Sequence, residues 1–298
     1  MSPRFIGILQ IIGAAVCWGT LGLVGTRLHQ LHFTSSQVAA VRIVGALAVL
    51  LLLLPLFWPY LRNLHWRRLP FLALQSMLGM LGMSWFYFAA VTHAGSAVAV
   101  ALLYTAPVWS LILARLILGE GIRPVQALLT VLAATGVALT MAGGIDAQPA
   151  GLLFGLLSGL CYALYGVLGK RAMQGNPPML VLFTSIAFSA LVLLATALPY
   201  DAAALLWQMP NKSVWLYALA LVLTGTLLPY FLFIKGLEKM PAAQASVFTI
   251  IEPLTAVLLA TLWLGEHIGV LQALGIALIV AAAAANAVLR PAPKRMPL

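Results

Sequence analysis

The chain repeats one pattern of uncommon residues at a fixed separation of 146 positions. The matched residues are a proline, a glycine–glutamate pair and a glutamine, namely Pro107, Gly119, Glu120 and Gln126 in one copy and Pro253, Gly265, Glu266 and Gln272 in the other. Further matches at a separation of 144 pair Cys17 with Cys161, Gly22 with Gly166 and Arg27 with Arg171. We therefore predict two copies of one half, residues 1–146 and residues 147–298.

The composition predicts that both halves lie in a lipid bilayer. Hydrophobic residues make up 63% of the chain and charged residues only 7%, against about 25% charged in ordinary soluble domains. This indicates a single membrane-embedded domain rather than soluble domains joined by linkers. The net charge of +10 is spread over short loops and the tail, which is typical of membrane orientation signals and not of a nucleic-acid-binding surface.

Ten apolar segments are each about long enough to cross a hydrocarbon core of ~30 Å. They are expected near residues 5–27, 37–57, 70–91, 96–117, 125–143, 150–171, 179–198, 214–235, 241–263 and 270–289. Backbone groups in lipid must be hydrogen-bonded within the chain, so these segments should be helices. The expected fold is all-α, with ten transmembrane helices.

The basic residues predict which way the helices run. If the N-terminus is cytoplasmic, thirteen of the 16 Lys and Arg residues fall on the cytoplasmic side. This asymmetry indicates that both termini are cytoplasmic. Each half has an odd number of spans, five, so the second half should enter the membrane inverted relative to the first. Inverted repeats around a central cavity, with a site near the midplane, are typical of alternating-access transporters.

Three prolines are expected to interrupt helices near that cavity. Pro107 and Pro253 lie at equivalent positions within the fourth and ninth segments, and Pro229 lies within the eighth. A proline lacks the N–H group and crowds the carbonyl four residues earlier. A static kink is the alternative for any one of them. The symmetric placement of Pro107 and Pro253 favours helix breaks that face the interior and take part in gating.

Aromatic residues with a polar group cluster at the middle depth of several segments. They are Trp18, Tyr87, Tyr104, Trp109, Tyr162, Tyr165 and Tyr230. When such side chains are buried, their O–H and N–H groups need partners, which a wet cavity supplies. A packing or lipid-facing role is the alternative for each one singly. As a set, they are predicted to include substrate-binding residues.

Two charged residues lie deep in the apolar segments. Glu252, next to Pro253, is the only one of six acids at such depth, and its repeat partner is Ala106. Because a charge in the membrane is costly, it points to function: contact with a substrate ammonium or transfer of a proton, the alternative being a structural bond to a neighbouring helix. Arg42 either snorkels to the outer interface or binds a substrate carboxylate.

Motifs for other functions are absent from the sequence. Gly169–Ala172 reads GKRA, which lacks the upstream glycine and the Ser/Thr of a phosphate-binding loop. There is no H-E-x-x-H or G-x-S-x-G motif, and the two cysteines stand alone, so no enzyme, metal or cofactor is predicted. A membrane enzyme or a pore remains an alternative without a supporting motif.

The paired phrases Pro107…Gly119-Glu120 and Ile251-Glu252-Pro253…Gly265-Glu266, with Trp18-Gly19, resemble the EamA-type ten-helix branch of the drug/metabolite transporter superfamily. The resemblance covers nearly the whole chain. It implies two inverted five-helix halves around a central cavity and export of small metabolites across a bacterial inner membrane. The mid-depth aromatic residues are also similar to the amino-acid exporter (YddG-like) subgroup.

The function expected is secondary transport. Small amphipathic metabolites, and amino acids including aromatic ones in particular, would leave the cell by alternating access. Efflux of cationic drugs is the alternative, because aromatic faces and a carboxylate suit such compounds equally well. The expected partners are the substrate and the lipid bilayer, and the sequence leaves the oligomeric state open.

Overall fold

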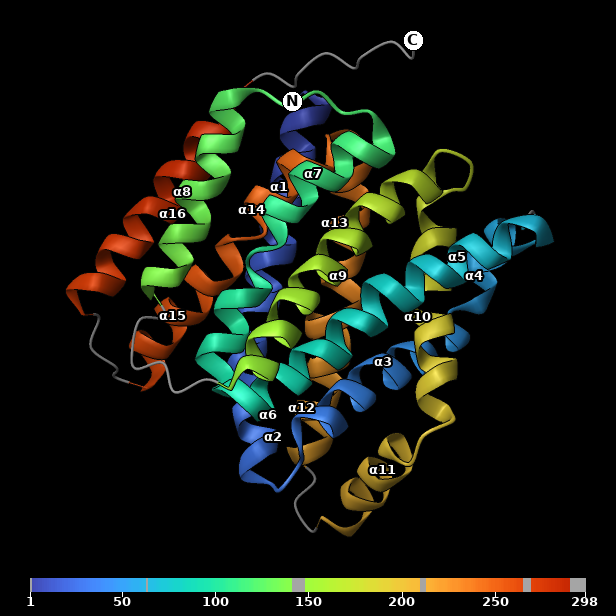
Figure 1. The fold of residues 1–298 in the computed structure, drawn as a ribbon. Coiled ribbons are helices and arrows are strands. Elements are labelled where there is room, and N and C mark those ends of the chain that lie inside the picture. Colours follow the sequence, from blue (N-terminus) through green and yellow to red (C-terminus); the bar gives the residue numbers. More distant parts are fainter. Residues whose placement is uncertain (1, 63, 141–147, 210–212, 265–268, 290–298) are drawn as a thin grey trace.

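The computed structural model describes the chain except for residues 1, 63, 141–147, 210–212, 265–268 and 290–298. Every regular element among the described residues is a helix (Figure 1), so the expectation of an all-helical protein is confirmed. The repeated pair Gly265-Glu266 lies outside the described residues.

The first half of the chain contains eight α-helices among the described residues. They are α1 (Pro3–Gly19), α2 (Leu21–Gln30), α3 (Ser35–Leu52), α4 (Leu54–Leu61), α5 (Leu69–Gln75), α6 (Gly82–Leu103), α7 (Ala106–Leu118) and α8 (Pro124–Thr140). A short 3-10 helix, η1 (Trp66–Arg68), precedes α5, and a π-helix, η2 (Ser76–Leu81), joins α5 to α6. Helix α6 continues through residues 92–95, where the sequence predicted a loop.

The second half contains another eight α-helices among the described residues. They are α9 (Pro149–Met173), α10 (Pro178–Leu194), α11 (Leu198–Gln208), α12 (Ser213–Val222), α13 (Leu228–Lys239), α14 (Ala242–Phe248), α15 (Ile251–Leu264) and α16 (Val270–Val288). A second π-helix, η3 (Leu223–Leu227), joins α12 to α13. The sequence analysis did not foresee α11, a separate helix bent 83° away from α10.

Five helical stretches of the described chain are long and apolar enough to cross a membrane, and α10 with α11 would make a sixth. The five are Ser35–Leu52, Trp66–Ala94, Val98–Leu118, Pro149–Met173 and Ser213–Lys239. Other expected spans are shorter or divided: α1 is separated from α2 at Thr20, and α14 from α15 at residues 249–250. The membrane class is thus confirmed, while ten spans remain a prediction.

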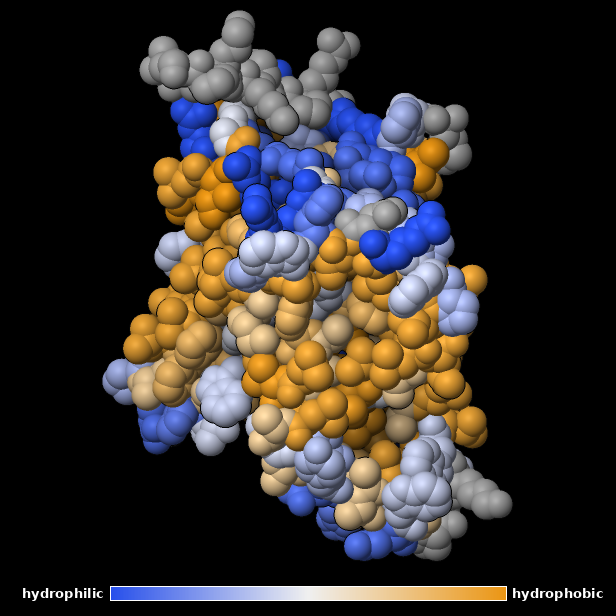
Figure 2. All heavy atoms as spheres, turned by 90° about the vertical axis from the view of Figure 1, so that its right-hand side faces the viewer, coloured by the Kyte–Doolittle hydropathy of each residue, from blue (hydrophilic) through white to orange (hydrophobic). Residues whose placement is uncertain are grey.

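The surface is arranged as a membrane protein requires. Figure 2 shows a broad band of hydrophobic residues between hydrophilic residues gathered at the upper and lower ends. Large apolar side chains such as Leu52, Leu116 and Leu262 are more than 70% exposed. Such exposure of apolar surface is favourable in lipid and not in water. The band is therefore the part of the surface that faces the bilayer.

Helices from the two halves of the chain pack against each other. Helix α6 lies along α9, α1 along α13, and α8 along α16, and the last pair stands at the left of Figure 1. The α6–α9 contact depends on glycine. A Cβ atom at Gly159 would lie 2.5 Å from Thr105 Oγ1 and 2.8 Å from the Leu102 carbonyl oxygen, so only glycine permits this approach. The two halves interleave instead of forming separate bodies.

Both halves contain an interrupted helix at the same place in the repeat. Helix α6 ends at Leu103 and α7 begins at Ala106, while α14 ends at Phe248 and α15 begins at Ile251. Pro107 and Pro253 fall in the first turn of the new helices, where a missing N–H group costs little. Each expected span is therefore two helices in series, with a turn between them.

The two π-helices also lie at equivalent positions in the two halves of the chain. A shift of 146 residues moves the last five residues of η2 onto η3. Helix η3 ends at Leu227, two residues before Pro229, which occupies the first turn of α13. In η2, Gly79 lies against α9, since a Cβ atom there would be 2.7 Å from Tyr165 Cα. π-turns of this kind occur frequently at functional sites.

Candidate functional site

Aromatic side chains from three helices form a cluster in the centre of the bundle. Its members are Trp18 of α1, Tyr162 and Tyr165 of α9, and Tyr230 and Phe233 of α13, all 8% exposed or less. The ring of Trp18 is edge-on to Tyr162 at 6.2 Å and to Tyr230 at 5.2 Å, measured between centroids. Tyr165 lies 5.3 Å from Tyr230 and 5.7 Å from Phe233. These are ordinary distances for favourable aromatic pairs.

The helical spacing explains why these rings meet. Tyr162 and Tyr165 are three residues apart, as are Tyr230 and Phe233, so each pair lies on one face of its helix. Helix α1 packs along α13 and brings Trp18 against Tyr162, Tyr230 and Phe233. The sequence analysis missed Phe233 because its ring carries no polar group. Its spacing of three from Tyr230 was the available signal.

Glu252 lies beside this cluster, in the first turn of α15. The Tyr162 hydroxyl donates to Glu252 Oε2 over 3.5 Å, and the Tyr104 hydroxyl is close enough to the same carboxyl group to interact with it electrostatically. A carboxylate in the first turn of a helix is stabilised by the positive end of the helix dipole. Because Tyr104 lies at the break between α6 and α7, the two helix interruptions meet at this acid.

Arg42 approaches the cluster from α3. Its Nη2 atom donates to the Tyr230 hydroxyl over 3.3 Å, and its guanidinium interacts electrostatically with the Glu252 carboxyl. The arginine thus points into the bundle, contrary to the snorkelling alternative. Among the described residues, no carboxylate lies within salt-bridge distance of Arg42 and no cation within that distance of Glu252.

Three buried donor groups of the site have no hydrogen-bond partner in the described part of the chain. They are the indole Nε1 of Trp18, the Nε of Arg42 and the hydroxyl of Tyr165. An unsatisfied buried polar group costs about 1–3 kcal/mol. Both Arg42 and Glu252 are only half-buried, so accessible space adjoins them. The site therefore offers donors and opposite charges to a polar ligand.

The other residues singled out from the sequence take different places. Tyr87 of α6 is half-buried and close enough to Glu252 to interact with it electrostatically. Pro107, Pro229 and Pro253 are buried at the helix junctions. Trp109 of α7 packs against the main hydrophobic core, and no described ring contact joins it to the aromatic cluster.

A polar network behind the aromatic cluster also escaped the sequence analysis. Ser76 Oγ donates to the Ser185 carbonyl over 2.7 Å and lies 2.8 Å from Ser189 Oγ. Ser185 Oγ in turn donates to Gln75 Oε1 over 2.8 Å. These bonds hold η2 against α10 on the side of Tyr165. Serines are too common in membrane helices for the sequence to have marked them.

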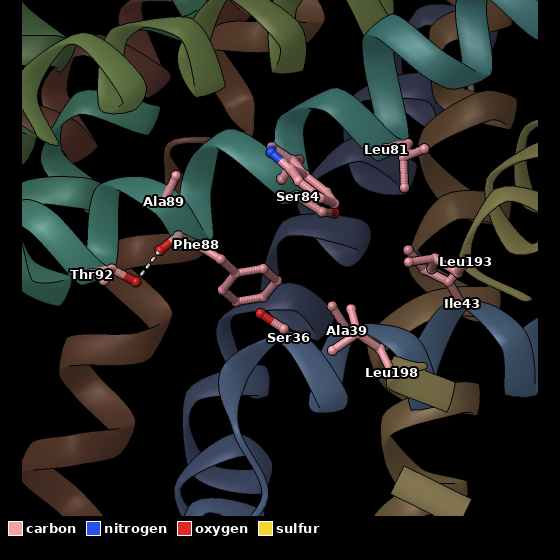
Figure 3. Close-up of a pocket in the computed structure, with 11 residues that line it drawn as sticks. Ser36, Ala39, Ile43, Leu81, Ser84, Phe88, Ala89, Thr92, Leu193 and Leu198 are labelled. Carbon is pink, nitrogen blue, oxygen red and sulfur yellow. Dashed lines mark hydrogen bonds between the residues drawn. The ribbon is translucent and has the colours of Figure 1, made fainter. Parts of the chain in front are cut away.

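A separate hollow of about 280 Å³ lies between α3, α6 and the junction of α10 with α11. Figure 3 shows Ser36 and Phe88 facing it from α3 and α6, with Ile43 and Leu193 farther along. Its described lining is apolar apart from the hydroxyl groups of Ser36, Ser84 and Thr92 and the indole N–H of Trp85. None of the aromatic cluster and neither deep charge lines it, so the two sites are distinct.

The chain is similar to transporters of known sequence and to a solved structure. It is 30% identical to the uncharacterized transporter YwfM of Bacillus subtilis over 91% of this chain and 90% of that protein. It is 29% identical to the threonine/homoserine exporter RhtA of Escherichia coli K12 over 78% of this chain and 76% of that protein. One crystal structure matches with a TM-score of 0.72 at 20% identity over 93% of this chain and 95% of the other, which shows a shared fold.

The family model for EamA-like transporters matches the chain twice, over residues 5–142 and again over residues 149–287. These two matches span nearly the whole sequence and account for its repeated pattern. The chain belongs to the EamA-like transporter family.

Proposed function

We propose that this membrane transporter exports small zwitterionic metabolites, foremost amino acids, by alternating access. The observation that carries the proposal is the pair of opposite charges deep in the bundle. Arg42 and Glu252 interact electrostatically, yet neither is in a salt bridge within the described chain. Two half-buried charges without an ion-pair partner are costly so far from water, and a ligand with both charges would neutralise the two together.

The geometry supports a proposed role for each group. The Arg42 guanidinium, fixed by Tyr230, presents a planar set of donors that matches a carboxylate. Glu252, held by Tyr162 at the N-terminus of α15, would accept the substrate ammonium. Trp18, Tyr104 and the neighbouring rings supply apolar and π surface for the side chain. Tyr87 of α6, which interacts electrostatically with Glu252, would complete the site.

Several further observations support this assignment. The exporter RhtA is named for threonine and homoserine, both of them amino acids. The twofold match to the family model supports two repeated halves, residues 1–146 and 147–298. The distribution of charge supports inverted insertion with both termini cytoplasmic. We also propose ten membrane spans, on the basis of the ten apolar segments of the sequence. The aromatic cluster supports the amino-acid exporter (YddG-like) subgroup.

The chain is assigned to the bacterial inner membrane, the location given in the name of its relative YicL of Salmonella typhimurium. One chain carries both charges and the aromatic cluster, so a monomer is sufficient for the proposed transport. The second candidate function is efflux of cationic compounds. It is favoured by Glu252 and the aromatic cluster, which suit a cation. Arg42, however, is itself a cation in the same site and would repel such a substrate.

Counterflow in proteoliposomes tests the proposal directly. Purified protein is reconstituted with an unlabelled panel of amino acids inside, and entry of a labelled amino acid is followed. Saturable exchange among amino acids is the expected result, since a carrier must release one substrate before it takes the next. Exchange of cationic dyes without amino acids would establish efflux instead, and unsaturable conductance would establish a pore.

A further inference from the structure

The first copy of the Gly-Glu pair, Gly119-Glu120, makes a contact between the two halves of the chain. Glu120 follows α7, and its Oε1 accepts a hydrogen bond from the backbone N–H of Ala242 over 2.9 Å. Its Oε2 accepts another from Ala243 over 3.3 Å. These two N–H groups open helix α14, so an acid of the first half caps a helix of the second. Figure 1 shows α7 and α14 close together.

The chain ends α7 in a way that presents this acid. Gly119 has a φ angle of +66°, a left-handed conformation that glycine adopts without strain. The N–H group of Glu120 then bonds back to the Ala114 carbonyl over 3.1 Å, which closes the helix end. The glycine thus turns the chain, and the following side chain is directed toward α14. This geometry explains why the two residues occur together.

Glu120 supplies the N-terminal cap that α14 lacks. The helix begins after Pro241, whose side chain cannot cap the free N–H groups of the first turn. A carboxylate at a helix N-terminus bonds these groups and interacts favourably with the helix dipole. Glu120 is only 9% exposed, so water competes little for either bond. The contact is therefore a strong one for the surface of a bundle.

A cation, Lys170, binds the turn between α13 and α14 from the other side. Lys170 of α9 donates to the Met240 carbonyl over 2.7 Å and also to the carbonyl of Leu237 at the end of α13. The turn between α13 and α14 is thus held by charges of opposite sign, each matched to the helix end that it meets.

We propose that the bonds from Glu120 to α14 keep the cytoplasmic side of this transporter closed, and that they break whenever the site opens to the cytoplasm. The proposal rests on alternating access, as proposed above. Helix α7 leads away from the break at Tyr104, and α14 leads toward the break before Glu252. The two helices are the cytoplasmic portions of the interrupted spans. When they are packed together, they close the path between the site and the cytoplasm.

Thiol labelling measures this closure without any substrate. Cys17 and Cys161 are first replaced by alanine, and Ser246→Cys in α14 then serves as the reporter, because Ser246 is 9% exposed in the closed arrangement. A membrane-impermeant thiol reagent is applied to the cytoplasmic face of inside-out vesicles. We expect Glu120→Ala to raise the labelling rate about tenfold or more, given the usual strength of hydrogen bonds to charged groups. Glu120→Gln, which keeps one acceptor, should give a smaller rise.

Glu238→Gln is the matched control. It also removes one negative charge, but from the exposed ion pair with Lys235. The Glu238 side chain makes no described bond to α14, so the labelling rate of Ser246→Cys should stay unchanged. If Glu120→Ala does not accumulate, Glu120→Gln carries the test alone. Labelling that is unchanged in folded Glu120 variants, or that rises equally in Glu238→Gln, would overturn the proposal. Absence of amino-acid counterflow in the parent protein would instead refute the proposed substrate, and the labelling result would still test the role of Glu120.

Discussion

At the scale of single residues, the site depends on two charges that the repeat does not duplicate. Glu252 occupies a position whose partner in the first half is Ala106, so only one of the two interrupted helices carries an acid. Arg42 lies near it on α3 and bonds Tyr230. A symmetric scaffold with asymmetric charges can orient a substrate that has two different ends.

Removing the Glu252 charge should weaken transport and change its pH dependence. Glu252→Gln preserves shape and one hydrogen-bond acceptor for Tyr162, but it can neither attract an ammonium nor exchange a proton. We expect amino-acid counterflow to fall about tenfold, as for loss of one charged hydrogen bond, with a flatter pH profile. Initial rates across the pH range measure both effects. An unchanged pH profile at normal expression contradicts proton exchange, and Glu238→Gln is the control.

Replacing Arg42 should separate the two candidate functions. Arg42→Gln removes the carboxylate contact, so the KM for a zwitterionic amino acid should rise about tenfold. Transport of the corresponding amine, which has no carboxylate, should change little or improve. Arg42→Lys should restore transport only in part, because an ammonium lacks the planar pair of donors. Equal effects on the amino acid and the amine would argue against Arg42 as the carboxylate partner.

At the scale of helices, the prolines and apolar runs predicted much of what is seen. Helix interruptions occur next to Pro107 and Pro253, and a π-helix precedes Pro229, because backbone chemistry near a proline is local. The contact of Tyr162 with Glu252, 90 positions apart, could not be predicted, since it depends on where the bundle places α9 and α15. For the same reason the sequence grouped Trp109 with the cluster and omitted Phe233.

The contact between α9 and the first interrupted helix should tolerate no side chain at Gly159. In Gly159→Ala the new Cβ would meet Thr105 Oγ1 at 2.5 Å and backbone oxygen at 2.8 Å. Backbone cannot move aside cheaply, so we expect destabilisation of about 1–3 kcal/mol. Gly25→Ala is the control, because nothing lies within 4 Å of a Cβ there. Thermal unfolding in detergent should show a lower Tm for the first variant only.

At the scale of the whole molecule, the two halves reproduce each other's local contacts. Arg27 donates to Gln30 over 3.2 Å at the end of α2, and Arg171 donates to Gln174 over 2.7 Å at the end of α9. The members of these pairs are 144 positions apart, the separation found in the sequence. A repeat that preserves surface contacts of this kind supports duplication of a complete folding unit.

Inversion of the halves predicts opposite sidedness for these equivalent glutamines. Gln30 and Gln174 are both exposed, so a cysteine at either position should react readily once Cys17 and Cys161 have been replaced. With both termini cytoplasmic, Gln30→Cys should be labelled by an impermeant thiol reagent only from outside intact cells. Gln174→Cys, beside the basic residues that favour the cytoplasm, should be labelled only from the inside, in inside-out vesicles. Labelling of both positions from one side would mean that the halves are parallel, and a site at an inverted-repeat interface would then lose its basis.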